Sequence, residues 1–165
     1  MSFKKKKYEI IKKAISPELA QFCYNYILLK RDVAATMFKT KYISPFEEAF
    51  GVWEKVTQQV PDTYAHYSDI AMETLLLKLH PLMEKKTGMN LFENYSYTRV
   101  YKKGDVLKRH KDRFSCEIST TLNLGGDPWP ICLEPSGRDG LKGIKVNLNP
   151  GDMLLYKGEE LEHWR

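Results

Sequence analysis

The feature that most constrains the fold of this sequence is a change of character near residue 94. Before it, two long stretches carry apolar residues at helical spacing, and after it, short β-prone runs alternate with turn residues. Helices followed by many short strands predict an α+β fold, in which helices back a β-sandwich or a jelly-roll barrel. A length of 165 residues fits one domain with one sizeable core. We therefore expect a single domain, with helical support over about 1–93 and a β core over about 94–165.

The first helix is predicted over residues 17–38. Ser16, Pro17 and Glu18 are typical of a helix start, with an N-cap serine, proline in the first turn and an acidic residue near the positive end of the helix dipole. Its apolar face should pack on the core. The charged residues 30–32, which begin with Lys30, should remain in solvent.

Ser68 and Asp69 open a second predicted helix, and Gly88 is placed to end it in a left-handed cap. Pro81 should kink this helix or end its first part, because proline lacks a backbone donor and clashes with the preceding turn. Residues 64–67, just before the helix, are expected to form a loop.

Six strands are predicted in the second half of the chain, because short β-prone runs are separated there by turns rich in glycine and proline. They are expected at residues 95–101, 106–111, 117–124, 131–134, 144–148 and 153–156.

Composition excludes several classes of protein. Hydrophobic residues make up 42% and charged residues 28% of the chain, which is ordinary for a globular protein. No apolar run approaches a bilayer span and no signal-peptide core is present, so we expect a cytoplasmic protein with no membrane partner. The three cysteines lie in no CxxC spacing, which argues against a disulfide framework or a zinc cage. Part of the net charge of +5 comes from lysines 4–7, which fit a frayed terminus better than a nucleic-acid site.

A candidate metal site begins at His110 and Asp112. Residues two apart on a strand project from the same face, so an imidazole nitrogen and a carboxylate oxygen can approach one ion. His163 follows a late predicted strand of the same barrel and supplies a third ligand. Two histidines and one carboxylate leave open positions on an octahedral metal, which is typical of Fe(II) oxygenases. His66 and His80 have no strand-paired carboxylate and are expected to be surface or hydrogen-bonded histidines.

Two segments resemble a known family. Residues 101–112 match the pattern Y-x-x-G-x-x-x-x-x-H-x-D of the prolyl 4-hydroxylase-like dioxygenases that depend on 2-oxoglutarate and Fe(II). Residues 149–156, followed by His163, are similar to the penultimate strands and distal histidine of that family. The resemblance covers roughly residues 94–165.

The resemblance implies a double-stranded β-helix (jelly-roll) core, Fe(II) held by the triad, and 2-oxoglutarate as co-substrate. It places Tyr101 near the co-substrate and puts Thr121 and Asn123 on a strand that lines its pocket. An ordinary core role for Tyr101 is an equally good reading. Ascorbate is a further cofactor consistent with the family.

The sequence departs from the family pattern at its end. The family binds the distal carboxylate of 2-oxoglutarate with a basic residue on the strand after the distal histidine, and here the chain stops at Arg165. We expect this strand to be absent, as in an incomplete version of a longer domain or a degenerate site that turns over poorly. Arg165 is too near His163 to be assumed equivalent, while Arg99 shares strand parity with Tyr101 and is a candidate for the same pocket.

The favoured function is oxidative decarboxylation of 2-oxoglutarate coupled to hydroxylation of a C–H bond, with succinate and CO₂ released. Peptidyl proline is the substrate that the resemblance suggests, which favours a protein or peptide partner over nucleic acid. A free amino acid or a nucleobase remains an alternative substrate, and six basic residues near the metal are candidates for phosphate contact. A non-catalytic barrel that binds a metal or a ligand is an alternative of a different class. The sequence leaves the oligomeric state open. The six basic residues are Lys102, Lys103, Lys108, Arg109, Lys111 and Arg113.

Overall fold

The computed structural model describes residues 3–53 and 59–165. Its helices are α1 (Phe3–Lys6), α2 (Pro17–Lys39), α3 (Ile70–Thr87) and the short 3-10 helix η1 (Phe114–Cys116). Its strands are β1 (Tyr8–Ile11), β2 (Val52–Trp53), β3 (Tyr64–Tyr67), β4 (Tyr97–Val100), β5 (Ile118–Leu122), β6 (Ile131–Leu133), β7 (Ile144–Val146), β8 (Met153–Lys157) and β9 (His163–Trp164).

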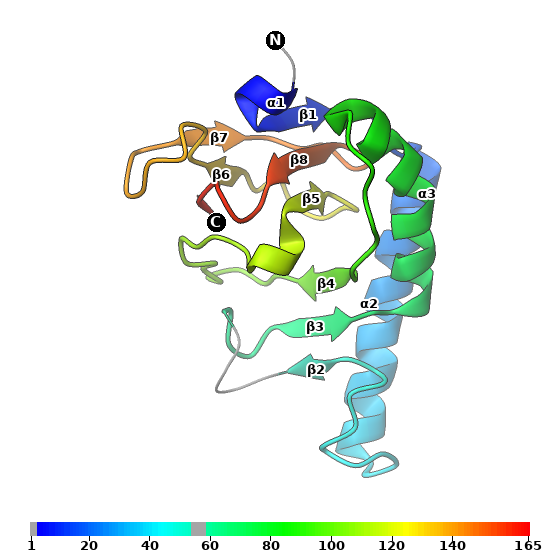
Figure 1. The fold of residues 1–165 in the computed structure, drawn as a ribbon. Helices are drawn as coiled ribbons and strands as arrows, with labels where there is room; N and C mark the ends of the chain where they lie inside the picture. The colour runs from blue at the N-terminus through cyan, green and yellow to red at the C-terminus, as the bar shows by residue number, and fades with distance from the viewer. Residues whose placement is uncertain (1–2, 54–58) are drawn as a thin grey trace.

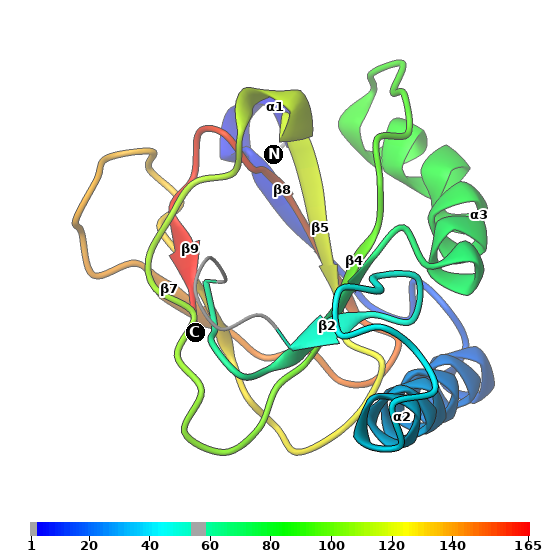
Figure 2. The same cartoon turned by 90° about the horizontal axis from the view of Figure 1, so that it is seen from below.

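The strands form three antiparallel sheets, with the orders β1-β8-β5, β2-β3-β4 and β7-β6-β9. In Figure 1 the strands β8, β5, β4, β3 and β2 succeed one another down the molecule, with α2 and α3 along one side. Figure 2 shows β7 and β9 on the side of the molecule away from these helices. Mixed helices and antiparallel sheets agree with the predicted α+β class.

Helix α2 begins where its capping signals predict. Ser16 is the N-cap and its hydroxyl accepts a hydrogen bond of 3.2 Å from the Leu19 amide, which satisfies one free donor of the first turn. Ala20, Cys23, Ile27 and Ala34 are buried along one face. The prediction that Lys30 remains in solvent is wrong. Its ammonium group forms an ion pair with the fully buried carboxylate of Asp69, because α2 packs beside the start of α3.

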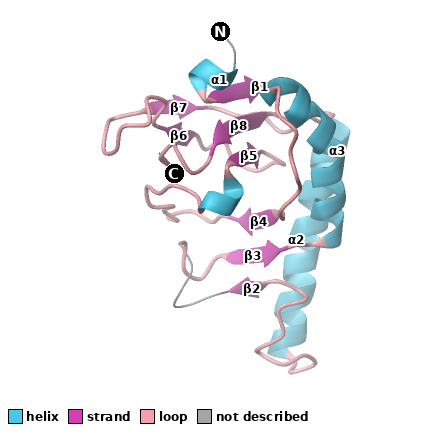
Figure 3. Ribbon diagram, viewed as in Figure 1, coloured by secondary structure: helices cyan, strands magenta, loops and turns pink. Residues whose placement is uncertain are grey.

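Helix α3 has the predicted ends but continues past Pro81. The Asp69 side chain accepts hydrogen bonds from the amides of Ala71 and Met72, and Gly88 closes the helix with a φ of 68°. Figure 3 shows α3 as one helix. Of the two outcomes predicted for Pro81, the end of the first part of the helix is therefore wrong. The apolar side chains of α3 pack on the core along the whole helix, which offsets the loss of one backbone hydrogen bond.

Five of the six predicted strands are present as β4 to β8, each with shorter or slightly shifted bounds. The loop predicted over residues 64–67 is wrong, since these residues form β3, the central strand of its sheet. Strands β1 and β2 were also not predicted, so the part before residue 94 is not purely helical. These strands have two to four residues, too few to show a period, and long-range pairing decides them.

Strand β8 lies at the centre of the core. Residues 153–156 are all buried, and they face opposite sides in turn: Met153 and Leu155 pack with the helices, whereas Leu154 and Tyr156 pack against β6 and β7. Burial on both faces explains the continuous apolar run in the sequence. This strand therefore joins the helical layer to the sheet that carries His163.

Among the described residues no helix combines the length and the apolar character that crossing a bilayer requires.

Candidate metal centre

The three predicted ligands converge in the structure. His163 lies on β9, and residues 107–110 run antiparallel to β9 with paired backbone hydrogen bonds at His110–His163 and at Leu107–Arg165. From one hydrogen-bonded pair to the other, the first segment advances by three residues (107 to 110) and the second by two (163 to 165). The extra residue in the first segment defines a β-bulge. The bulge explains why the strand predicted at residues 106–111 appears only as an isolated bridge. The direct pairing of His110 with His163 brings their ring centroids to 4.2 Å from each other.

The ligand atoms are spaced as one small ion requires. Oδ1 of Asp112 lies 3.5 Å from Nε2 of His163 and 3.9 Å from Nε2 of His110. One ligand atom from each of the three residues lies within 4.8 Å of the other two. Ligand atoms bound to one first-row metal at about 2.0–2.2 Å lie roughly 3–4 Å apart. The donor set therefore fits a single metal ion.

Both histidines are oriented for binding through Nε2. Nδ1 of His110 lies 2.8 Å from the Lys108 carbonyl oxygen, and Nδ1 of His163 lies 3.1 Å from the Leu161 carbonyl oxygen. A carbonyl accepts only, so each Nδ1 carries the proton and donates it. The lone pair of each Nε2 is then free for a metal, an arrangement common among histidine ligands.

The carboxylate of Asp112 is held from behind. The Ser119 hydroxyl donates a hydrogen bond of 2.6 Å to Oδ2 of Asp112, which leaves Oδ1 facing the histidines. Gly158 follows β8 beside this pair, and a Cβ atom at that position would lie 2.5 Å from both Oδ2 and the Ser119 oxygen. The backbone amide of Asp112 also donates to the Gly158 carbonyl at 2.9 Å. Glycine is therefore required where the chain passes the carboxylate.

The electrostatics of the site favour the protonation states that bind metal. Burial and the neighbouring charge of His163 lower the pKa of His110, so this imidazole is neutral at neutral pH. Burial alone would raise the pKa of Asp112. The hydrogen bond and the charge of His163, together with the hydrogen bond from the Ser119 hydroxyl, hold that pKa below its ordinary value. Asp112 is therefore ionised at neutral pH.

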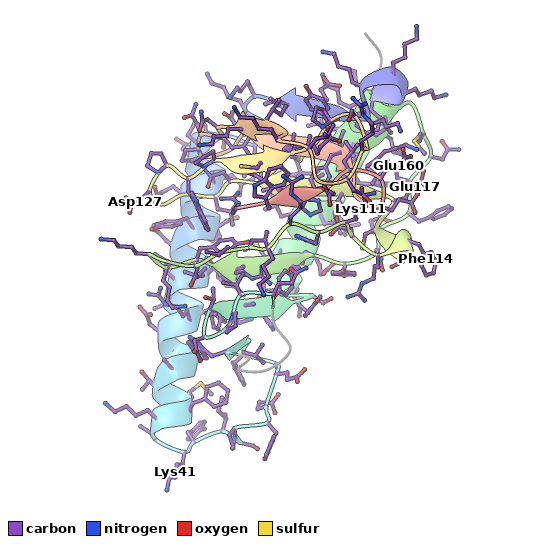
Figure 4. All side chains as sticks on the ribbon, turned by 90° about the vertical axis from the view of Figure 1, so that its left-hand side faces the viewer. Lys41, Lys111, Phe114, Glu117, Asp127 and Glu160 are labelled. Atoms are coloured by element: carbon purple, nitrogen blue, oxygen red, sulfur yellow. The ribbon has the colours of Figure 1, made fainter. Side chains whose placement is uncertain are left out.

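The triad opens onto a large cleft of about 1680 Å³. Residues of β4 and β5 line it, and within the described residues each of these strands pairs with one neighbouring strand. Asp127 and Phe114 both line the cleft and lie on opposite sides of the molecule in Figure 4. The cleft therefore extends across the molecule.

The other predicted site residues also line this cleft. Tyr101 packs edge to face on Trp129, with ring centroids 5.0 Å apart. The Arg99 guanidinium donates hydrogen bonds to the Tyr97 and Tyr101 hydroxyls at 2.9 and 3.3 Å. Thr121 lies on β5, two residues after Ser119 and on the same face.

The side chain of Asn123 is occupied by backbone partners. Its amide nitrogen donates to the Leu148 carbonyl at 2.7 Å, and its oxygen accepts from the Gly125 amide at 3.2 Å. These contacts stabilise the turn after β5. The predicted co-substrate roles of Tyr101, Arg99, Thr121 and Asn123 remain predictions.

Four residues of the site were missed in the sequence: Ser119, Gly158, Tyr156 and Arg165. Ser119 lies two residues before Thr121 on a predicted strand, so it was expected on the same face as a predicted site residue and could have been found. Tyr156 packs its ring 4.8 Å from that of His163, and burial raises its pKa. Arg165, which was set aside for its closeness to His163, reaches the same cleft from the end of β9. Nothing in the sequence pointed to Gly158.

The two remaining histidines lie elsewhere. Nδ1 of His66, buried in β3, lies 3.3 Å from the Asp69 carboxylate. Nε2 of His80 lies 2.9 Å from the Leu91 carbonyl oxygen, and its Nδ1 lies 2.9 Å from Glu93. Both side chains have local polar contacts, and neither approaches the triad.

Comparison with known proteins gives a structural likeness. No family model matches the sequence and no curated protein matches it. Among solved structures, a prolyl-4-hydroxylase of Pseudomonas putida is similar, with a TM-score of 0.62 and 14% sequence identity over 98% of this chain and 85% of the other. At this identity the likeness shows a shared fold. It agrees with the resemblance seen in residues 101–112 and 149–163.

Proposed function

We propose that this chain is a 2-oxoglutarate- and Fe(II)-dependent dioxygenase that hydroxylates a C–H bond and releases succinate and CO₂. In this proposal residues 1–165 form one such domain with a double-stranded β-helix core. The observation that carries it is the triad, with both Nε2 atoms and Oδ1 of Asp112 turned toward one another at the wall of a large cleft. The prolyl-4-hydroxylase neighbour supports it.

His110, Asp112 and His163 would hold the iron. Two imidazoles and one carboxylate suit a divalent first-row ion and leave coordination positions for other ligands. When bound, the iron and 2-oxoglutarate supply the oxidative chemistry. The chain itself orients the ligands through the Leu161 and Lys108 carbonyls and the Ser119 hydroxyl, and it places the site on a cleft wall.

The co-substrate would lie in the cleft beside the triad. Tyr101 offers a hydroxyl and a ring edge, and Thr121 offers a hydroxyl from β5. Asn123 shapes the wall through its backbone contacts with Leu148 and Gly125. Ascorbate would act as a reductant of the iron, and the proposal assigns no residues to its binding.

A protein or peptide is the substrate class that we favour, with peptidyl proline first. The cleft extends past the triad toward Phe114, a residue that is 85% exposed. The similar structure is described as a prolyl-4-hydroxylase. A free amino acid remains the alternative if peptides are not turned over.

Nucleic acid is less well supported as a substrate, because basic side chains near the metal already have partners. Ion pairs join Lys102 to Asp105 at 2.7 Å, Arg109 to Glu162 at 2.8 Å and Lys111 to Asp139 at 2.6 Å. Paired charges contribute less to the release of counterions that drives phosphate binding.

Turnover of 2-oxoglutarate tests the proposal. The chain is incubated with Fe(II), 2-oxoglutarate and dioxygen, and succinate is measured with and without a proline-containing peptide. We expect succinate from the wild type, a rise with a peptide substrate, and none above background from Asp112→Ala. Asp127→Ala is a matched control, because Asp127 is an exposed carboxylate at the far end of the same cleft.

The same experiment distinguishes the alternative of a non-catalytic metal-binding domain. Metal binding without any succinate would favour that alternative over the dioxygenase. Equal succinate formation by the wild type and Asp112→Ala would contradict the proposed site.

A further inference from the structure

The β-bulge decides which residue lies opposite His163. Leu107 pairs with Arg165 through two backbone hydrogen bonds, of 3.1 and 3.0 Å. In an antiparallel ladder without a bulge, this pairing would continue with Arg109 opposite His163. The bulge inserts one residue, so that His110 takes that place. A shift of one residue turns each side chain to the other face of a sheet, so the bulge determines that an imidazole rather than a guanidinium faces the second histidine.

The Arg109 side chain is bound on the other face. Its Nη1 atom donates a hydrogen bond of 2.8 Å to the Glu162 carboxylate, and its guanidinium carbon lies 3.6 Å from the Trp164 ring centroid. Glu162 and Trp164 are the two neighbours of His163 in the chain, and neighbours in extended backbone project to opposite faces. Arg109 therefore contacts the ligand segment from the side away from the imidazole rings.

These contacts are partly shielded from solvent. The side chains of Arg109 and Glu162 are 29% and 15% exposed. The loop between β6 and β7 packs on both partners of the arginine: the Gly140 amide donates to the same carboxylate at 2.8 Å, and a Cβ atom at Gly143 would lie 2.6 Å from the Trp164 ring. A guanidinium over an indole ring, paired with a carboxylate, is a favourable arrangement that gains strength when it is desolvated.

The bulge also orients the ring of His110. Lys108 and Arg109 are the two residues between the hydrogen-bonded pairs, and both oppose Trp164. The Lys108 carbonyl oxygen lies 2.8 Å from Nδ1 of His110 and accepts its proton. Loss of the bulge would therefore remove both the position of His110 and the bond that directs its Nε2 toward the metal.

We propose that Arg109 is a positioning residue of the metal centre: held between Trp164 and Glu162, it keeps the bulge in place and so keeps His110 opposite His163. This inference rests on the metal centre of the proposed function and deepens it. Arg109 contacts no triad side chain, and its effect passes through the pairing of the two backbone segments.

Amide hydrogen exchange in the metal-free protein tests the pairing directly. The His110 and His163 amides donate to each other's carbonyls at 3.1 and 2.9 Å, so both exchange only when this pairing opens. We expect both to exchange about 10-fold faster in Arg109→Gln, while the amides of β8 keep their wild-type rates. Lys86→Gln is the matched control, because it removes a partly exposed ion pair of 2.6 Å with Glu9 that joins α3 to β1 and involves no triad segment.

Titration of Mn(II) tests the consequence for the metal centre. Arg109→Gln and Glu162→Gln should each bind Mn(II) about 10-fold more weakly than the wild type, as is typical when a group that orients a ligand is lost. The double variant should bind no more weakly than either single variant, because both changes remove the same contact. Lys86→Gln should keep the wild-type affinity.

The possible failures are distinguishable. Wild-type exchange of the two amides in Arg109→Gln overturns the inference, and so does faster exchange throughout the protein, which would indicate a general loss of stability. Faster exchange of the two amides with unchanged Mn(II) affinity would show that the bulge does not position the ligand. If the wild type binds no Mn(II), the dioxygenase proposal fails, and the exchange rates alone decide whether Arg109 fixes the pairing of His110 with His163.

Discussion

The Ser119 hydroxyl donates a 2.6 Å hydrogen bond to Oδ2 of Asp112, so that the other carboxylate oxygen faces the two histidines. The contact joins β5 to the segment that follows His110, and it fixes the rotation of the only acidic member of the triad. Loss of a group that orients a metal ligand from behind typically weakens metal binding by about 10- to 100-fold.

We predict that Ser119→Ala weakens Mn(II) binding by about 10- to 100-fold, because Asp112 loses the bond that orients it. The midpoint temperature of thermal unfolding should change little, since Ser119 is only partly buried. Ser115→Ala makes the same chemical change at an exposed position of η1 and should keep wild-type affinity. Unchanged affinity in Ser119→Ala would show that Asp112 is oriented by other contacts.

Gly158→Ala should impair metal binding at least as much as Ser119→Ala. The added methyl group would lie 2.5 Å from Oδ2 of Asp112 and from the Ser119 oxygen, so one of them must move. In the double variant the two losses should not add, because both act through Asp112. Calorimetry of the two single variants and the double variant measures this coupling. If the losses in metal-binding free energy add in the double variant, the two substitutions act on different groups.

Asp69 is predicted to be important for stability, because its buried carboxylate joins α2 to α3. It pairs with Lys30, accepts a 2.8 Å bond from the Tyr26 hydroxyl and caps α3. Burial alone would raise the pKa of Asp69, but the bond and charge from Lys30 and the bond from Tyr26 hold it below its ordinary value of 3.8. Asp69→Asn should cost about 3–5 kcal/mol at neutral pH, since it leaves the Lys30 charge unpaired.

The sign of the pH dependence follows from the lowered pKa of Asp69. A carboxylate with a lowered pKa in the folded state stabilises the fold above its unfolded-state pKa, and this contribution is lost as the pH falls through the folded value. The stability gap between wild type and Asp69→Asn, measured by urea unfolding, should therefore narrow below pH 3.8. A gap that stays constant from pH 7 to pH 3 would mean that the carboxylate charge does not stabilise the fold.

Local chemistry in the sequence predicted much of the fold. The caps at Ser16, Asp69 and Gly88 depend on neighbouring residues alone, so both long helices were found with their ends. The triad was predictable for a similar reason. His110 and Asp112 are two residues apart, and His163 follows a buried strand.

Contacts between distant segments could not be predicted. The pairing of Lys30 with Asp69, the role of Tyr64–Tyr67 as a central strand, and the bulge opposite His163 depend on which segments become neighbours. Arg165 was set aside on sequence distance, although its placement beside Tyr101 depends on the pairing of β9 with residues 107–110. Ser119 and Gly158 are common residue types, and they are important here because both contact the carboxylate of Asp112.

The central claim is that His110, Asp112 and His163 bind one metal ion, and calorimetric titration of Mn(II) tests it most directly. The account predicts one ion per chain for the wild type and for Asp127→Ala, and loss of this binding in Asp112→Ala and in His163→Ala. Binding of Mn(II) to both of these variants with wild-type stoichiometry and affinity would contradict it.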